Sequence, residues 1–136
     1  QVETLNALEA SGIAIAGWKL GQTSGESRDA FGVGYRAFGY VRADRLYRND
    51  EPVSWAQVTP GQIETELCMI LTKDLTGDVT PQQARDAVRL AAGFELNQKR
   101  LGKEASPEER IADNLSNYGI VVGEPVEVPD NWQQGG

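Results

Sequence analysis

The stretch Ile63-Glu64-Thr65-Glu66-Leu67-Cys68-Met69-Ile70-Leu71 decides how the rest of the chain is interpreted. It forms most of the segment Gln62–Thr72, the clearest predicted strand in the sequence, because apolar and β-branched residues follow one another there. Side chains alternate between the two faces of a strand, so Glu64 and Glu66 share one face. Since both faces are largely apolar apart from the two glutamates, we expect a central strand that is buried on both sides.

Two carboxylates on one face of a buried strand repel each other and lose their hydration. Glu64 and Glu66 would lie about 7 Å apart along the strand. Burial without a partner would raise their pKa values and cost several kcal/mol for each group. A bound Mg²⁺ or Mn²⁺ removes this penalty, because hard cations prefer carboxylate oxygens. The alternative is that this end of the strand is exposed and both glutamates are solvated.

A third acid, Glu95, is flanked by apolar residues in Phe94–Asn97, which we expect to be a short strand. It follows a predicted helix over Pro81–Ala92, which Thr80 would cap and Pro81 would begin. Three carboxylates could occupy one side of an octahedral Mg²⁺ site and leave the other positions to substrate oxygens and water. The alternative for Glu95 is a surface charge at a strand edge or a helix end.

Lys19 lies at the end of another predicted strand, Ile13–Leu20, between Gly17 and Gly21. Glycines allow close approach of other groups to the backbone. A lysine that emerges from an apolar strand is a candidate for proton transfer through a lowered pKa, or for binding a substrate carboxylate. The alternative is a lysine whose ammonium group simply extends into solvent.

The other predicted elements are short and are joined by irregular loops. They are a helix over Val2–Ala10, a glycine-rich loop over 21–34, strands near Ala37–Val41, Arg45–Tyr47 and Tyr118–Val122, and a helical segment over Glu104–Ile111. The sequence has no internal repeat and no regular alternation of strands and helices. We therefore predict an α+β fold that forms a single domain over residues 1–136.

Composition excludes several classes of function. The 136 residues include 13 basic and 20 acidic ones and no histidine, for a net charge of −7, whereas a nucleic-acid surface needs clustered lysine and arginine. No apolar run approaches the ~20 residues that span a bilayer, and no secretion signal is visible. The single cysteine, Cys68, cannot form an internal disulfide, which fits the cytoplasm. Without histidine, Ser/His and Cys/His catalysis is excluded and a metal site must use oxygen ligands.

Taken in order along the chain, these segments resemble the 2-keto-4-pentenoate hydratase and 4-oxalocrotonate decarboxylase group of the fumarylacetoacetate hydrolase superfamily. The resemblance runs from about Ile13 to Gly123. A lysine segment followed by Glu-x-Glu and then a third Glu is a fairly specific combination. The matching motifs are Gly17-Trp18-Lys19-Leu20-Gly21-Gln22-Thr23-Ser24, Gly32-Val33, Phe38-Gly39, Ile63-Glu64-Thr65-Glu66-Leu67, Glu95 with Arg100, and Ala112-Asp113-Asn114-Leu115-Ser116.

The resemblance implies a mixed β-roll or barrel of the fumarylacetoacetate hydrolase type. The domain is incomplete here, because members of the family are nearly twice as long. It implies that Glu64, Glu66 and Glu95 bind Mg²⁺ or Mn²⁺, and that the metal chelates the carboxylate and 2-oxo oxygens of a 2-oxo-enoic acid. It also implies that Lys19 transfers a proton or binds the carboxylate. Ser116 and Arg100 would contact the substrate. The alternative for Ser116 is a serine that caps its loop.

The implied activity is that of a metal-dependent lyase in the catabolism of aromatic compounds. Hydration of 2-hydroxypenta-2,4-dienoate is the first expectation, and decarboxylation of 4-oxalocrotonate is the alternative. Family hydratases usually carry an acid directly after Gly32-Val33, where this chain has Gly34-Tyr35-Arg36-Ala37, and this departure favours decarboxylation. C–C bond hydrolysis, for which a histidine base is usual, ranks lower.

Enzymes of this group associate with one another. We therefore expect a homo-oligomer or a complex with a related lyase subunit. A non-catalytic, truncated subunit of such an assembly is a further alternative.

Overall fold

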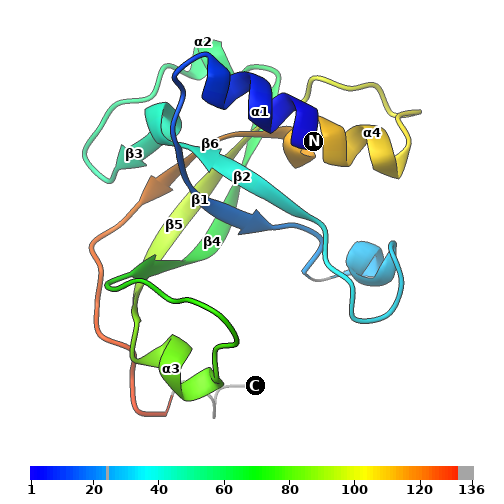
Figure 1. The fold of residues 1–136 in the computed structure, drawn as a ribbon. Helices are drawn as coiled ribbons and strands as arrows, with labels where there is room; N and C mark the ends of the chain where they lie inside the picture. Colours follow the sequence, from blue (N-terminus) through cyan, green and yellow to red (C-terminus); the bar gives the residue numbers. More distant parts are fainter. Residues whose placement is uncertain (24, 132–136) are drawn as a thin grey trace.

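The predicted α+β class is confirmed by the computed structural model, which describes residues 1–23 and 25–131. Ser24, the last residue of the lysine motif, and the polar tail at 132–136 lie outside the described residues. Short helices and 3₁₀ turns surround two separate β-sheets (Figure 1). The architecture thus depends on strand pairing more than on helix packing.

The two sheets share no strand, and the β1–β2 hairpin crosses in front of the larger sheet (Figure 1). In the larger sheet β3 and β6 are parallel, whereas the β6–β5 and β5–β4 pairs are antiparallel. The smaller sheet consists of β1 (Ile15–Leu20) and β2 (Phe38–Arg42), and the larger one, in the order β3-β6-β5-β4, of β3 (Leu46–Arg48), β6 (Asn117–Val122), β5 (Val88–Gln98) and β4 (Gly61–Leu71).

The predicted helix over Pro81–Ala92 is wrong beyond its first turns. Helix α3 ends at Arg85, after a capping box between Thr80 and Gln83, and strand β5 begins at Val88. From Val88 onward, the apolar residues that had suggested a helical period pair with β4 instead, in one unbroken antiparallel register. A run that is apolar at nearly every position is compatible with the period of a helix and with that of a strand. Here the pairing with the long strand β4 makes it a strand. The predicted strand Phe94–Asn97 is the second half of β5.

Strand β4 is not the central strand that the sequence suggested. It lies at the end of the strand order, with β5 as its only neighbour within the described residues. Four large side chains on one of its faces are more than half exposed: Ile63 56%, Leu67 60%, Met69 56% and Leu71 61%. These four residues are called the apolar face of β4 below. The expected burial on both sides is therefore wrong for the described chain.

The buried core lies over β5 and β6 of the same sheet. Val58, Leu96 and Tyr118 form its centre, and Val58 is completely buried. Val58 ends helix α2 (Trp55–Val58), which covers the β5 end that carries Leu96. The guanidinium of Arg45 lies 4.2 Å from the centre of the Tyr118 ring, a cation–π contact that adds to this end.

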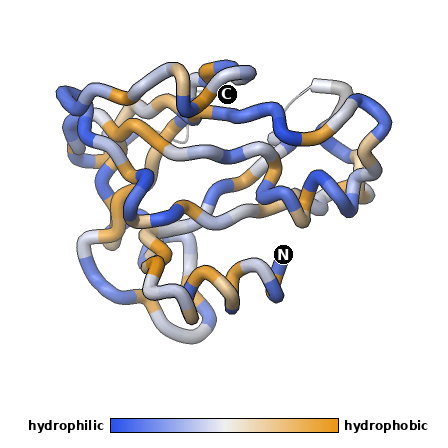
Figure 2. The backbone as a smooth tube through the Cα atoms, turned by 90° about the horizontal axis from the view of Figure 1, so that it is seen from above, coloured by the Kyte–Doolittle hydropathy of each residue, from blue (hydrophilic) through white to orange (hydrophobic). Residues whose placement is uncertain are grey.

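The remaining elements connect the strands. Helix α1 (Val2–Ala10) has the predicted bounds and buries none of its residues, and Figure 2 shows it at one side of the molecule. None of the helices in the described chain has the length and apolar character needed to cross a bilayer. Helix α4 (Pro107–Ala112) lies where a helical segment over Glu104–Ile111 was predicted, and the 3₁₀ turn η1 (Glu26–Asp29) lies inside the predicted glycine-rich loop. The other connecting elements are α3 (Pro81–Arg85) and the 3₁₀ turns η2 (Ala43–Arg45) and η3 (Asn114–Ser116).

Candidate metal centre

The three acids singled out in the sequence meet on one face of the β4–β5 pair. In the register of the two strands Glu64 lies opposite Glu95, and Glu66 lies opposite Gly93. One carboxylate oxygen from each glutamate lies within 4.8 Å of those of the other two. Glu95 is only 1% exposed, Glu66 is half-buried and Glu64 is exposed. The side chains thus form a group that one small cation could contact.

Burial and mutual repulsion both disfavour the charged forms of these carboxylates. Like charges directly across a strand pair destabilise a sheet, as for Glu64 and Glu95 here. The pKa of the Glu66 carboxyl is raised, first by burial and then by the charge of Glu95, with a smaller contribution from Glu64; Lys19 opposes the shift. A cation between the carboxylates would offset both the repulsion and the cost of desolvation.

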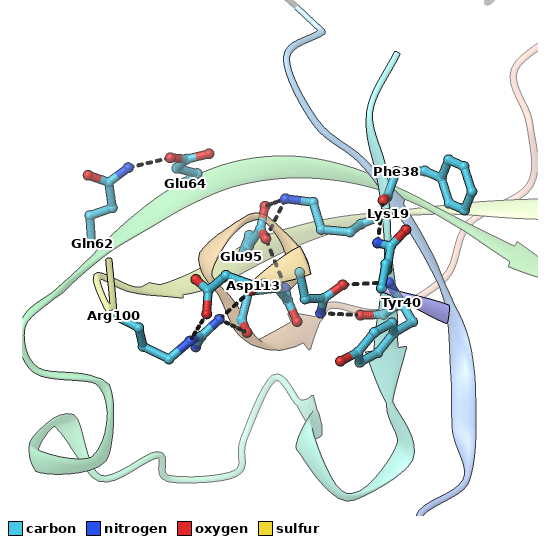
Figure 3. A network of polar contacts seen from close by, with 11 residues as sticks. Lys19, Phe38, Tyr40, Gln62, Glu64, Glu95, Arg100 and Asp113 are labelled. Atoms are coloured by element: carbon cyan, nitrogen blue, oxygen red, sulfur yellow. Dashed lines mark hydrogen bonds and ion pairs between the residues drawn. The ribbon is translucent and has the colours of Figure 1, made fainter. Parts of the chain in front are cut away.

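Lys19 reaches Glu95 from strand β1 of the hairpin. Its Nζ donates to both carboxylate oxygens of Glu95, at 2.7 and 2.8 Å (Figure 3). Asn117, the first residue of β6, donates from Nδ2 to Oε1 of the same carboxylate at 2.8 Å. Three hydrogen bonds from residues of two different sheets therefore fix the position of the Glu95 carboxylate, the most buried of the three.

The hairpin that carries Lys19 is joined to the turn before β6. Asn114 accepts a hydrogen bond from the Tyr40 backbone N–H at 2.8 Å and donates one to the Tyr40 carbonyl at 2.9 Å. Gly39 makes this approach possible, because a Cβ there would lie 2.5 Å from Asn114 Oδ1 and 3.3 Å from Lys19 Cγ. Gly39 is also the residue paired with Lys19 in the hairpin. Lys19 and Asn114 of the turn therefore both pack closely against Gly39 of β2.

The turn itself has an unusual backbone. Asn114, Leu115 and Ser116 have φ angles of 58°, 54° and 65°, three successive non-glycine residues in the left-handed region. Each such residue costs about 1 kcal/mol or more, so other contacts must maintain the turn. The turn brings Ser116 to the wall of the same cavity as Lys19 and the three glutamates. This placement agrees with the predicted contact between Ser116 and a substrate, which stays a prediction.

Arg100 maintains this turn from outside the cavity. Its Nε donates to Asp113 Oδ1 at 2.7 Å, and its Nη2 donates to the Asp113 carbonyl at 2.7 Å and the Asn117 carbonyl at 3.3 Å (Figure 3). Arg100 is not among the described residues that line the cavity. Its contacts therefore do not support the predicted contact with a substrate. They indicate a positioning role for the turn that holds Asn114 and Ser116.

The cavity around the three glutamates has a volume of about 630 Å³. Its wall combines oxygen-bearing side chains with basic ones. Beside Lys19, Glu64, Glu66, Glu95 and Ser116 it includes Gln22, Thr23, Gln62, Asn97, Lys99, Lys103 and Arg110. The volume is in the range of small-molecule sites in proteins.

Two buried oxygens in this wall indicate what the cavity accepts. Gln22 Oε1 and Asn97 Oδ1 have no hydrogen-bond partner among the described residues. Buried acceptors without a partner are uncommon, and a cation, a water or a substrate hydroxyl would satisfy them. The possible ligands are thus three carboxylates and two amide oxygens, all of them oxygen donors. Such a donor set fits a hard cation such as Mg²⁺ or Mn²⁺.

Sequence reasoning gave no role to three amide side chains at this site, Gln62, Asn114 and Asn117, and noted Asn97 only as an amide after Glu95 that could orient a ligand. Gln62 donates from Nε2 to Glu64 Oε1, and Asn97 lies two positions after Glu95. Strand alternation places both on the face of the glutamates, so this signal could have found them. Asn114 and Asn117 could not be found in this way, because their contacts depend on the left-handed turn.

Comparisons with known proteins identify relatives of this chain. No protein-family model matches the chain. A 4-oxalocrotonate decarboxylase from a Pseudomonas species is 32% identical over 114 residues, which cover 82% of this chain and 44% of that protein. A 2-keto-4-pentenoate hydratase from Paraburkholderia phymatum is 32% identical over 117 residues, covering 84% and 45%. The chain thus spans about half the length of the curated relatives that it matches.

Solved structures show the same relationship at the level of the fold. The structure of 4-oxalocrotonate decarboxylase from Pseudomonas putida G7, complexed with magnesium and adipate, matches with a TM-score of 0.79 and 22% identity. The match covers 93% of this chain and 50% of that chain. The same enzyme complexed with calcium and acetate gives a TM-score of 0.76. The described strands therefore have the fold of about half of that enzyme.

Proposed function

This chain is a homologue of 2-keto-4-pentenoate hydratases and of 4-oxalocrotonate decarboxylase, and on that premise we propose that it forms part of a divalent-metal-dependent lyase. The proposed substrates are 2-oxo or 2-hydroxy-dienoic acids from the catabolism of aromatic compounds. The observation that carries the proposal is the convergence of Glu64, Glu66 and Glu95 within 4.8 Å, beside Lys19. Sequence similarity alone would leave open whether the site is retained.

We propose that these three carboxylates hold Mg²⁺, or Mn²⁺ in its place. The structural neighbour was solved with magnesium and also with calcium, which supports a divalent cation at such a site. A divalent cation, when bound, supplies a Lewis acid for the carbonyl of a 2-oxo acid. Gln22 and Asn97 offer further oxygens in the same wall, to the cation, to its waters or to a substrate hydroxyl.

Lys19 and Ser116 are the proposed residues of the chain for handling the substrate. The ammonium group of Lys19 lies at the cavity wall with Glu95 as its partner, so it can hold a substrate carboxylate or move a proton when dienol and ketone interconvert. Ser116 offers a hydroxyl on the same wall. Arg100 and Asn114 position the turn that carries Ser116, and Asn117 positions Glu95.

The relatives support a hydratase and a decarboxylase about equally. We propose the hydratase-like reaction first, with the decarboxylase-like reaction as the alternative. One observation favours the alternative: among the described residues that line the cavity, the three glutamates are the only acids. No further carboxylate is therefore present there to activate a water molecule. Decarboxylation needs no such group.

The exposed apolar face of β4 supports assembly with another chain. We propose either a second copy or a related lyase subunit as the partner. A non-catalytic subunit would bind metal and a partner without turning over a substrate.

The proposal is tested in two steps. Adding Mg²⁺ or Mn²⁺ should raise the melting temperature of the chain, and Glu66→Gln should remove most of that rise. No rise in the unmodified chain would overturn the metal site. The second step follows the absorbance of 2-hydroxypenta-2,4-dienoate, with and without EDTA, and identifies the product. Metal binding without turnover of this acid or of 4-oxalocrotonate would favour the non-catalytic subunit.

A further inference from the structure

Lys19 places a positive charge inside the group of three glutamates. Its Nζ lies 2.7 Å from Oε1 and 2.8 Å from Oε2 of Glu95. The pair is largely buried, because the side chains of Lys19 and Glu95 are 11% and 1% exposed. Among the ion pairs within the described part of the chain, it is the only one that involves any of the three glutamates. A cation that enters the cavity therefore meets a carboxylate that already has a cationic partner.

The hydrogen bonds of Glu95 leave few of its lone pairs for another ligand. A carboxylate has about four lone-pair positions, two on each oxygen. Oε1 accepts from Lys19 Nζ and from Asn117 Nδ2, and Oε2 accepts from Lys19 Nζ. One position, on Oε2, is thus left. A cation cannot contact both oxygens of Glu95 while Lys19 keeps both of its hydrogen bonds.

The hairpin restrains the lysine side chain at this place. Lys19 lies opposite Gly39 in the β1–β2 pair. A Cβ at Gly39 would lie 3.3 Å from Lys19 Cγ, so the first carbons of the lysine side chain run closely along β2. The ammonium group therefore stays near the glutamates even when one of its hydrogen bonds to Glu95 is broken.

The charges of this group match those of one divalent cation. When all are ionised, the three glutamates carry three negative charges and Lys19 carries one positive charge, which leaves a net charge of −2. Without Lys19 the three glutamates alone would match a trivalent cation. The repulsion between Lys19 and a bound cation grows with the charge of that cation. Lys19 should therefore disfavour a trivalent cation more than a divalent one of the same size.

We propose that Lys19 competes with the bound metal for the oxygens of Glu95 and thereby makes the centre selective for divalent over trivalent cations. The inference rests on the proposed function, because it requires that Glu64, Glu66 and Glu95 hold the cation. It also assigns a consequence to metal binding: Lys19 gives up part of its contact with Glu95 and can donate to a substrate carboxylate instead.

The test compares Ca²⁺ and La³⁺, two ions that are close in size and differ in charge. Calorimetric titrations use the full chain and its Lys19→Gln variant, whose amide can still donate to Glu95 and so preserve the fold. The variant should bind Ca²⁺ at least about tenfold more tightly than the unmodified chain does. Its affinity for La³⁺ should increase by a still larger factor, because the lost repulsion is greater for the higher charge.

Lys99→Gln is the matched control. Lys99 lines the same cavity, is exposed and forms no ion pair within the residues that the structure describes. Its replacement removes the same charge without changing the contacts of Glu95. Because solvent screens an exposed charge, the affinities for both ions should change by less than about threefold.

A second measurement uses the unmodified chain and does not depend on the folding of a variant. The lysines are acetylated with acetic anhydride, with and without saturating Ca²⁺, and mass spectrometry follows each one. Lys19 should react severalfold faster when Ca²⁺ is bound, because it has then lost part of its contact with Glu95. The rate at Lys99 should stay the same.

The outcomes separate the inference from the proposed function. If Ca²⁺ binds the unmodified chain but binds Lys19→Gln no more tightly, or if La³⁺ gains no more than Ca²⁺, the inference is overturned and the metal site remains. An acetylation rate of Lys19 that does not respond to bound Ca²⁺ overturns it as well. If neither Ca²⁺ nor Mg²⁺ binds the unmodified chain, the proposed metal site fails, and the inference fails with it.

Discussion

Lys19 donates hydrogen bonds to both carboxylate oxygens of Glu95, at 2.7 and 2.8 Å, across 76 positions of the sequence. The pair joins the two sheets, since Lys19 belongs to β1 and Glu95 to β5. The ammonium group of Lys19, which comes from the hairpin, compensates the negative charge of the buried Glu95 carboxylate. Glu64 lies opposite Glu95 in the β4–β5 pair, and one carboxylate oxygen each of Glu64 and Glu66 lies within 4.8 Å of one of Glu95.

Removing one member of this pair should be costly. Lys19→Met leaves the Glu95 charge buried with only the Asn117 amide as a donor, and we expect a loss of about 3 kcal/mol in the free energy of unfolding. The double variant Lys19→Met/Glu95→Gln should recover most of that loss, because no buried charge remains. Urea unfolding in EDTA measures both. Equal stabilities of the single and double variants would contradict the role of the ion pair.

Gly39→Ala should destabilise the chain by about 1–3 kcal/mol, because the added Cβ would meet Asn114 Oδ1 at 2.5 Å. The clash would push apart the hairpin and the turn, and it should also reduce the rise in melting temperature caused by Mg²⁺. Gly17→Ala is the matched control, since a Cβ there meets nothing within 4 Å and lies on the same hairpin. Equal effects of the two substitutions would show that the contact with Asn114 is unimportant.

The raised pKa of Glu66 predicts a stability difference that depends on pH. Folding without metal favours the protonated form of this carboxyl, so the folded chain loses stability as pH rises through the raised pKa. Glu66→Gln cannot ionise. In EDTA the variant should therefore be more stable than the unmodified chain at about pH 8, by less than about 1 kcal/mol for this half-buried group. The gap should close well below the ordinary glutamate pKa.

Thermal unfolding over a series of pH values, with and without Mg²⁺, checks this expectation. A saturating amount of Mg²⁺ should reverse the order at about pH 8, because only the unmodified chain then gains from the metal. A gap that does not change with pH would mean that Glu66 ionises with its ordinary pKa.

The apolar face of β4 predicts self-association. An edge strand with large exposed apolar side chains is a template for pairing with another chain. Leu67→Lys should shift the chain towards the monomer in sedimentation experiments and leave Mg²⁺ binding intact, because Leu67 points away from Glu64 and Glu66. Thr76→Lys adds the same charge to an exposed loop and should change neither property. An unmodified chain that is monomeric at high concentration would contradict this prediction.

Local patterns of the sequence were sufficient for some parts of the molecule. The strand around Glu64 and Glu66 shows a clear run of β-forming residues, and alternation puts both acids on one face. Lys19 could be predicted as a site residue because it lies at the end of an apolar strand. The segment Val88–Ala92 was misassigned because a nearly continuous apolar run contains no period that separates a helix from a buried strand.

Other parts depend on contacts that no local pattern contains. The position of β4 at the sheet edge is set by the whole strand order, and its own composition suggested the opposite. The roles of Asn114 and Asn117 require three left-handed residues in succession, which the residue types there do not indicate. The Arg100 contacts depend on the same turn.

A change in the left-handed turn at Asn114–Ser116 would affect residues outside the turn. It directs one asparagine back to the hairpin at Tyr40 and allows the next, Asn117, to reach forward to Glu95. A single bend thus sets the distance between the two strands that supply the lysine and its carboxylate partner. Relaxing the bend would misalign both members of the ion pair together, even though neither of them belongs to it.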